Sequence, residues 1–306
     1  MKFKRLGLFC IITALLLTSC GKLGFGLKKP EFPQTGAAQD VASAQVEWAV
    51  KNETIPQKMP VYRVKNQKAD EEQTAKLLSL FGFSEPTITK DTDPAGRAQI
   101  VYQEGSKYLR VVNSTIFVYL AGQRATEEQL SLSDDEVKKQ AKEFLQENDL
   151  LPEGFVMNER LGYTELTGDG IDTPIVSQKT VEFHRQIDGI KVYGVAKVAV
   201  SFTNNGISEV YCVYDEYELD RSYDCKSFAE AKAALFSSDA RVSVESDYNV
   251  ESVRITDCEM VYYANAAVGM DTIHPCIRFK GEVVDSKGET VTFSSMIPAL
   301  TEESYR

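Results

Sequence analysis

The segment VEFHRQIDGIKVYGVAKVAVSFTNNG, residues 181–206, decides how this chain folds. Asp188-Gly189 and Asn204-Asn205-Gly206 are strong β-hairpin signals, because both supply residues that tolerate positive φ angles. The residues between the turns are rich in β-branched and aromatic side chains, which favour strands. The segment therefore predicts antiparallel strands at about 179–187, 190–203 and 207–219.

A helix is predicted ahead of these strands. Ser133 and Glu136 have the spacing of a capping box, in which each side chain bonds to the backbone N–H of the other residue. Comparable helix starts occur at Asp70 and Ser227, and strand-like segments follow each of them. The apolar face of the middle helix is formed by Val137, Ala141, Phe144 and Leu145.

These patterns predict an α+β fold in which one helix packs on an antiparallel β-meander, a unit used three times. Each unit buries a modest core, so the units are expected to lean on one another. The predicted boundaries are a leader at 1–19, a flexible tether at 20–45, and units at 46–125, 126–222 and 223–306.

The first residues have the form of a secretory leader. Lys2, Lys4 and Arg5 form a positive n-region, and Leu6 to Leu17 form an apolar h-region. As a helix this region is about 18 Å long, which is too short to span a hydrocarbon core of about 30 Å. The pattern therefore indicates a signal peptide.

The end of the leader, Leu17-Thr18-Ser19-Cys20, resembles a bacterial lipobox. The resemblance implies that Cys20 receives a diacylglyceryl group and becomes the mature N-terminus, anchored by two or more acyl chains. The alternative is a leader cleaved elsewhere, with Cys20 an ordinary residue. We predict a lipid-anchored protein on the outer face of the cell membrane, or in an outer membrane if the cell has two membranes.

The net charge of the chain excludes some classes of binding partner. The chain has a formal charge of −11, and removal of the leader lowers it to −14. Nucleic-acid binding needs clustered Lys and Arg, so this class is not expected. An acidic body is also repelled by anionic lipid headgroups. The membrane is therefore a partner only through the lipid at Cys20, with the Gly-, Pro- and Gln-containing segment 20–45 as a tether.

Two stretches of the sequence look like the extracytoplasmic part of the YycI regulatory-protein family and, more loosely, PepSY-type propeptide modules. In both families a helix is followed by a hairpin with Asp-Gly and then by Gly-Ile. YycI-type proteins enter the membrane by a transmembrane helix, whereas this chain has a lipobox, so any partner contact falls to the soluble body. The residues that carry the likeness are 181–193, Gly206-Ile207, 227–231, Tyr262-Tyr263 and 274–279.

The resemblance implies a protein that is not an enzyme, needs no cofactor, and acts on a membrane or wall-associated protein such as a sensor kinase. The alternative is a PepSY-like inhibitor or chaperone module for an exported peptidase. The sequence leaves the partner's identity and the oligomeric state open. It contains none of the common nucleotide-, metal- or nucleophile-bearing motifs.

Beyond the leader, Cys212, Cys225, Cys258 and Cys276 allow three disulfide pairings. Cys258 and Cys276 fall on neighbouring predicted strands whose hairpin centres near residue 267, so a bridge between them is one hypothesis. Four unpaired thiols are the other. None of these cysteines has the spacing of a zinc site, and no metal is expected.

Tyrosines suggest an interaction face. Tyr211 and Tyr217 lie on the same face of a continuous strand at 207–219, if side chains alternate along it. Tyrosine is favoured at interfaces, because it buries a large area at a small entropic cost. Ordinary packing within a tyrosine-rich sheet is the alternative interpretation.

Overall fold

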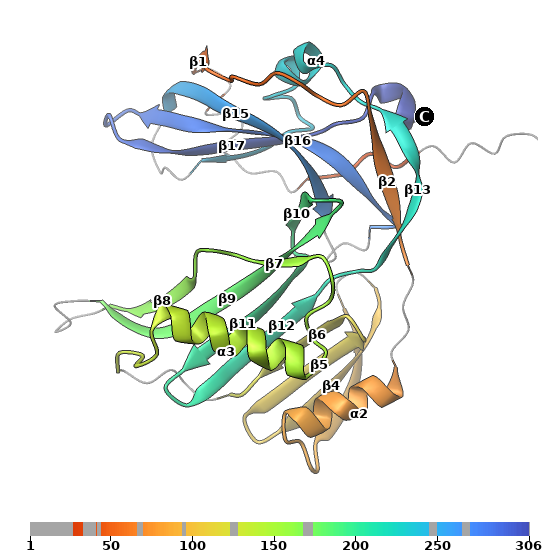
Figure 1. Cartoon of the computed structure of the whole chain (residues 1–306), viewed down its shortest axis with the longest axis vertical. Helices are drawn as coiled ribbons and strands as arrows, with labels where there is room; N and C mark the ends of the chain where they lie inside the picture. Colours follow the sequence, from red (N-terminus) through yellow and green to blue (C-terminus); the bar gives the residue numbers. More distant parts are fainter. Residues whose placement is uncertain are drawn as a thin grey trace, which may run out of the picture.

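The computed structural model describes residues 27–32, 41, 44–65, 70–93, 96–122, 128–167, 174–244, 250–264 and 270–305. Seventeen strands dominate this part of the chain, and their ladders connect them into one large mixed β-sheet. Figure 1 shows two groups of strands, with β10 between them. We call these groups the antiparallel section and the mixed section.

The antiparallel section follows the order β3-β4-β5-β6-β12-β11-β9, and both β7 and β8 pair with β9. Every ladder within it is antiparallel. Its strands are β3 (Thr87–Thr92), β4 (Ala98–Glu104), β5 (Lys107–Asn113), β6 (Ile116–Leu120), β7 (Phe155–Met157), β8 (Gly162–Leu166), β9 (Ile175–Ile187), β11 (Lys197–Thr203) and β12 (Gly206–Val213).

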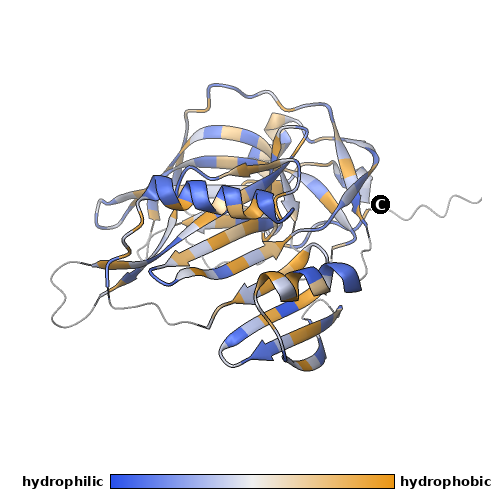
Figure 2. Cartoon of the chain, turned by 60° about the horizontal axis from the view of Figure 1, so that its bottom comes forward, coloured by the Kyte–Doolittle hydropathy of each residue, from blue (hydrophilic) through white to orange (hydrophobic). Residues whose placement is uncertain are grey.

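Two amphipathic helices cover one face of this section (Figure 1). Helix α2 (Glu71–Leu80) begins at the N-cap Asp70, and α3 (Asp134–Glu147) begins at the predicted Ser133–Glu136 capping box. Their apolar sides meet the inward positions of the strands in the largest hydrophobic core. Figure 2 shows the polar outer sides of these helices. Fully buried members of this core include Leu77, Leu109, Phe117, Leu145 and Phe183.

The mixed section follows the order β14-β17-β16-β15, and its ladders are antiparallel. Two further strands, β1 and β10, lie parallel to β15 along its remaining edge. Helix α4 (Phe228–Ala233) packs with a second hydrophobic core on one face of this section. The strands are β1 (Gln45–Trp48), β10 (Ile190–Gly194), β14 (Arg241–Val244), β15 (Val250–Ala264), β16 (Thr272–Asp285) and β17 (Thr290–Pro298).

Two connections join the sections. The β9–β10 hairpin turns at Asp188-Gly189, and β10 then continues onto the edge of β15. Strand β2 (Lys58–Val64) pairs with both β13 (Tyr217–Asp224) and the start of β16. The last element of the described residues is the 3₁₀ helix η2 (Glu302–Tyr305). The long-range pairings thus bring together residues from every part of the described chain.

The predicted α+β fold of three helix-on-meander units is wrong. The structure is mostly a large mixed sheet, and its ladders run between the predicted units: β6 pairs with β12, and β10 with β15. The physical reason is that a meander too small to bury a full core leaves strand edges with unpaired N–H and C=O groups. Here those edges pair with one another, some of them in parallel.

The predictions of individual helix starts and turns were more accurate than the prediction of the fold. The helix starts at Asp70, Ser133 and Ser227 are confirmed, as are the hairpin turns Asp188-Gly189 and Asn204–Gly206. The predicted boundaries between the three units stay a prediction. Within the described residues, the structure has no helix that is both long and apolar enough to cross a membrane.

Cys20 and the rest of the predicted lipobox lie outside the described residues. Part of the predicted tether is described, and it packs on the body. Phe32 is buried against Tyr263, with ring centres 4.9 Å apart, and the Lys29 ammonium pairs with Asp239 and Glu302. Residues 27–32 therefore belong to the folded part of the protein.

Candidate functional site

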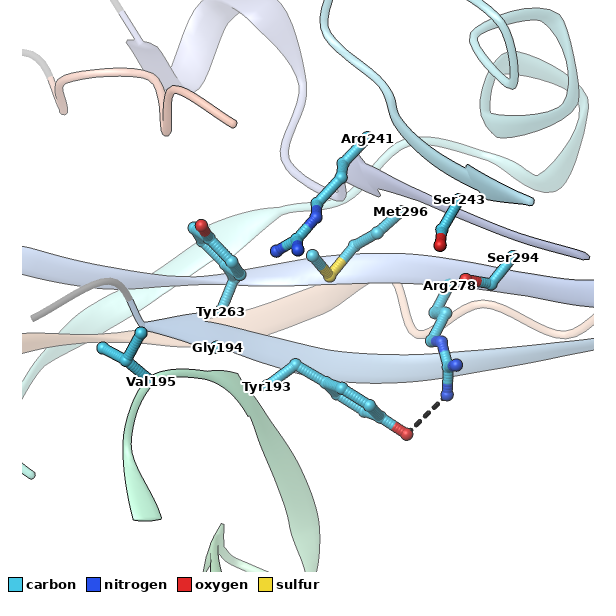
Figure 3. Close-up of a pocket in the computed structure, with 9 residues that line it drawn as sticks. All are labelled: Tyr193, Gly194, Val195, Arg241, Ser243, Tyr263, Arg278, Ser294 and Met296. Atoms are coloured by element: carbon cyan, nitrogen blue, oxygen red, sulfur yellow. Dashed lines mark hydrogen bonds between the residues drawn. The ribbon is translucent and has the colours of Figure 1, made fainter. Parts of the chain in front are cut away.

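A pocket of about 470 Å³ opens on the face of the mixed section opposite α4. Its walls come from β10, β14, β15, β16 and β17, so it lies where the β9–β10 hairpin joins the mixed section (Figure 3). This volume is in the range of small-molecule and side-chain binding sites. The lining side chains that carry polar groups are Tyr193, Arg241, Ser243, Tyr263, Arg278 and Ser294.

The strand register explains why these residues meet. Met296 of β17 lies between Arg241 of β14 and Arg278 of β16, in one row across the sheet. Glu259 of β15 continues that row beside Arg278. The next row on the same face contains Ser243, Ser294, Lys280 and Asp257.

Tyr193 enters the pocket from β10, the strand that links the two sections of the sheet. It lies opposite Tyr263 in the parallel β10–β15 ladder. The next residue, Gly194, has φ +115°, and a Cβ atom there would lie 1.9 Å from the backbone oxygen of Ala264. A glycine is therefore required for β10 to approach β15 this closely.

Arg278 is held in place by its neighbours. Its Nη1 donates hydrogen bonds to the Tyr193 hydroxyl, at 2.5 Å, and to the Glu259 carboxylate, at 3.2 Å. Its Cζ atom lies 4.5 Å from the centre of the Tyr193 ring, a cation–π contact. Burial raises the pKa of Tyr193, so its hydroxyl stays protonated at neutral pH. These contacts fix a guanidinium at the pocket wall.

Arg241 differs from Arg278, because it has no acidic partner among the described residues. Its side chain is partly exposed and extends toward Met296 and Tyr263 (Figure 3). In the neighbouring row, the Lys280 ammonium pairs with Asp257 and Glu259 and holds the pKa of Asp257 below its usual range. These two rows thus carry three cations and two carboxylates, and Arg241 is the cation without an acidic partner among the described residues.

Tyr211 and Tyr217, the predicted interaction face, do not lie on one continuous strand. The chain leaves the sheet between β12 and β13, so the two residues lie on different strands. Tyr211 packs beside the small cluster around Val118, whereas Tyr217 packs against the main core. There the Arg185 guanidinium lies 4.6 Å from the centre of the Tyr217 ring. Both tyrosines are partly buried in these contacts, and an interaction face at them stays a prediction.

The hypothetical Cys258–Cys276 bridge is not present, and both thiols are free. In the β15–β16 ladder, Cys258 lies opposite Phe279 and Cys276 opposite Val261. Cys258 and Val261 are three residues apart on one strand, so their side chains point to opposite faces of the sheet. A hairpin centred at residue 267 would pair Cys258 with Cys276, but the ladder is centred later in the chain, and this register puts the thiols on different faces. Cys212 and Cys225 are also free.

The described residues contain no group of three or more His, Cys, Asp or Glu side chains arranged to hold a metal ion. His274 is buried in β16, and its Nε2 lies 2.8 Å from the Thr272 hydroxyl. The donors that the pocket offers are guanidinium and hydroxyl groups. Such groups bind anions and hydrogen-bond acceptors.

Sequence reasoning missed Arg241 and Arg278 as site residues. One signal was available for Arg278, since it stands between the apolar residues Ile277 and Phe279 in a strand segment. A charged residue in such a run marks a face that is open or polar. No comparable signal marks Arg241, which reaches the pocket only through the pairing of β14 with β17.

Comparisons with known proteins add little to this geometry. No protein-family model matches the sequence, and no curated protein matches it. The structure is similar to the crystal structure of YycH from Bacillus subtilis, with a TM-score of 0.34 and 11% sequence identity over 82% of this chain and 69% of that chain. A TM-score of this size does not establish a shared fold, so no property of YycH is transferred to this chain.

Proposed function

We propose that this chain is a lipid-anchored extracytoplasmic binding protein, without enzymatic activity, that engages a membrane or wall-associated protein through the pocket on the mixed section. The leader and the Leu17–Cys20 lipobox support the anchor. The sequence likeness to YycI-type regulators supports a membrane protein such as a sensor kinase as the partner. The pocket supplies a binding site on the soluble body, where a lipid-anchored protein must make its contacts.

The observation that carries this proposal is the contact between Phe32 and Tyr263. Tyr263 lines the pocket, and Phe32 packs on its ring with an edge-to-face geometry. If Cys20 is lipidated, only the twelve residues from Gly21 to Phe32 separate the anchor from the pocket wall. Fully extended, they span at most about 42 Å. The pocket is therefore confined to a layer close to the membrane.

This confinement favours a partner that is itself fixed in or on the membrane. Two proteins held in the same thin layer meet at a high effective concentration, so a modest affinity is sufficient. Because the acidic body is repelled by anionic headgroups, contact with an exposed segment of a protein is favoured over contact with the lipid surface.

The test has two arms in the producing cell. Metabolic labelling with a fatty acid should label the chain, and Cys20→Ser should abolish the label and release the protein from the membrane. A photo-crosslinking amino acid at the exposed Ser243 position, beside the pocket, should capture one membrane-associated partner. The same amino acid at the exposed Glu165 position on β8 is the matched control and should capture none.

Either arm can overturn the proposal. A chain without label that floats free in the medium would remove the anchor. Equal capture from Ser243 and Glu165 would show that the pocket is not the binding face. If the captured protein is an exported peptidase rather than a kinase or a wall enzyme, the PepSY-like role as inhibitor or chaperone replaces the regulatory one.

A further inference from the structure

The pocket combines two guanidinium groups with serine and tyrosine hydroxyls in a chain of formal charge −11. An acidic protein that places its arginines together in a concave site concentrates positive potential there. A group of arginines in one pocket is not expected from the acidic composition of the chain. It therefore gives information about the ligand.

We infer that the pocket binds a carboxylate of an acidic peptide segment, with Arg241 as the principal anion-binding group. This inference rests on the proposed function, because it states what the partner presents to the pocket. Arg241 can still bind an anion, since it has no acidic partner among the described residues. Arg278 is already paired with Glu259. A carboxylate is the planar group that matches a guanidinium fork.

The surroundings of Arg241 complete a binding site of suitable chemistry. Its guanidinium extends toward Tyr263 (Figure 3), while Ser243 and Ser294 add two hydroxyl groups to the pocket wall in the neighbouring row. Met296 forms an apolar floor beneath the guanidinium. An acidic side chain can thus place its methylene groups on Met296 and its carboxylate against Arg241.

Arg278 has a different part in this arrangement. Its contacts with Tyr193 and Glu259 limit its capacity for a second anion. It still adds positive potential at the wall, where its Cζ atom lies 4.5 Å from the centre of the Tyr193 ring. We therefore expect Arg278 to strengthen binding less than Arg241 does.

The experiment is calorimetric titration of the full chain, purified in mild detergent, with an acetylated tetraglutamate amide. The tetraglutamine amide and inorganic phosphate are titrated in parallel. We expect the tetraglutamate to bind and the tetraglutamine not to bind. Arg241→Gln should weaken tetraglutamate binding at least tenfold, and Arg241→Lys should restore part of it.

The matched control is Arg221→Gln, which removes the same charge from the exposed strand β13. This variant should bind tetraglutamate within twofold of the unmodified chain. An equal loss in the two Gln variants would reduce the effect to overall charge and overturn the inference. Binding of phosphate in preference to tetraglutamate, with the same dependence on Arg241, would overturn the assignment to a carboxylate.

The failures of the two proposals are distinguishable. If tetraglutamate does not bind, or if crosslinking from Ser243 in cells persists unchanged in Arg241→Gln, the carboxylate inference falls while the binding face stands. If crosslinking from Ser243 is absent but tetraglutamate binds through Arg241, the proposed partner contact falls while the chemistry of the pocket stands. Thermal unfolding of Arg241→Gln verifies that the variant is folded.

Discussion

The Cζ atom of Arg278 lies 4.5 Å from the centre of the Tyr193 ring, and its Nη1 donates a 2.5 Å hydrogen bond to the hydroxyl of the same tyrosine. Tyr193 belongs to the hairpin strand that arrives from the antiparallel section, and Arg278 belongs to the mixed section. This pair therefore joins the two sections at the wall of the pocket.

The energy of this pair can be measured with a double-mutant cycle. Tyr193→Phe removes only the hydroxyl, and we expect a loss of about 1 kcal/mol. For Tyr193→Ala and Arg278→Ala we expect a coupling energy of about 1–2 kcal/mol, measured by urea unfolding. The control pair is Arg221 and Tyr223, which make a 4.8 Å cation–π contact at the surface. Its coupling should be a few tenths of a kcal/mol, and equal coupling in both cycles would contradict the prediction.

A second prediction concerns the backbone of the same strand. Gly194→Ala places a methyl group against the Ala264 oxygen and strains a positive φ, so we expect it to destabilise the protein by about 3 kcal/mol or more. Gly189→Ala strains a similar φ, but nothing lies within 4 Å of the added carbon. It should cost about 1 kcal/mol. If urea unfolding gives equal costs, β10 does not approach β15 as closely as described.

These two glycines show which structural features could be predicted from the sequence and which could not. Asp188-Gly189 is a local signal, and it predicted its turn correctly, as the Ser133–Glu136 spacing predicted its helix start. Local chemistry settles such features, because the interacting groups lie within a few residues of one another. Gly194 carries no such signal, since its requirement comes from Ala264, seventy residues away.

The site was beyond sequence reasoning for a related reason. Period-two alternation shows which side chains share a face, but it does not show which strands are neighbours. Arg241 and Arg278 reach one pocket only because β17 lies between their strands. The same limit explains the tyrosines: alternation was carried from Tyr211 to Tyr217 across a break in the strand.

Low pH should reduce the free energy of unfolding, because the stabilising contribution of the Glu182 carboxylate is lost. Its carboxylate accepts hydrogen bonds from His184 and from Lys197, and these, against the opposing effect of burial, lower its pKa from 4.5 to about 2. A carboxylate with a lowered folded-state pKa stabilises the protein above the unfolded-state pKa. That contribution is lost as the pH falls from about 4.5 toward 2.

The measurement compares Glu182→Gln with the unmodified chain by urea unfolding at several pH values. At pH 7 the variant should be less stable by about 1 kcal/mol, and the difference should shrink below pH 4.5. Glu165→Gln, at an exposed position on β8, is the control and should show no difference at any pH. A difference for Glu182→Gln that stays constant down to pH 3 would show that the carboxylate is not held by these partners.

The thiols should react in an order set by burial. Cys212 and Cys276 are buried, and burial raises the pKa of each thiol far above its usual value. Cys225 and Cys258 are partly exposed, and burial raises the pKa of each to about 11. In the folded protein at pH 8, a maleimide should therefore label Cys225 and Cys258 slowly, and Cys212 and Cys276 only after unfolding. Residue-specific labelling followed by mass spectrometry gives these rates.

The same reagent tests the register of the β15–β16 hairpin. When the protein is denatured without reductant, all four thiols should be labelled, because Cys258 and Cys276 point to opposite faces of the sheet. Recovery of a disulfide-linked peptide containing both residues would mean that the ladder is shifted by an odd number of residues. Such a shift would move Arg278 to the opposite face, away from Tyr193 and Arg241, so this measurement also checks the pocket.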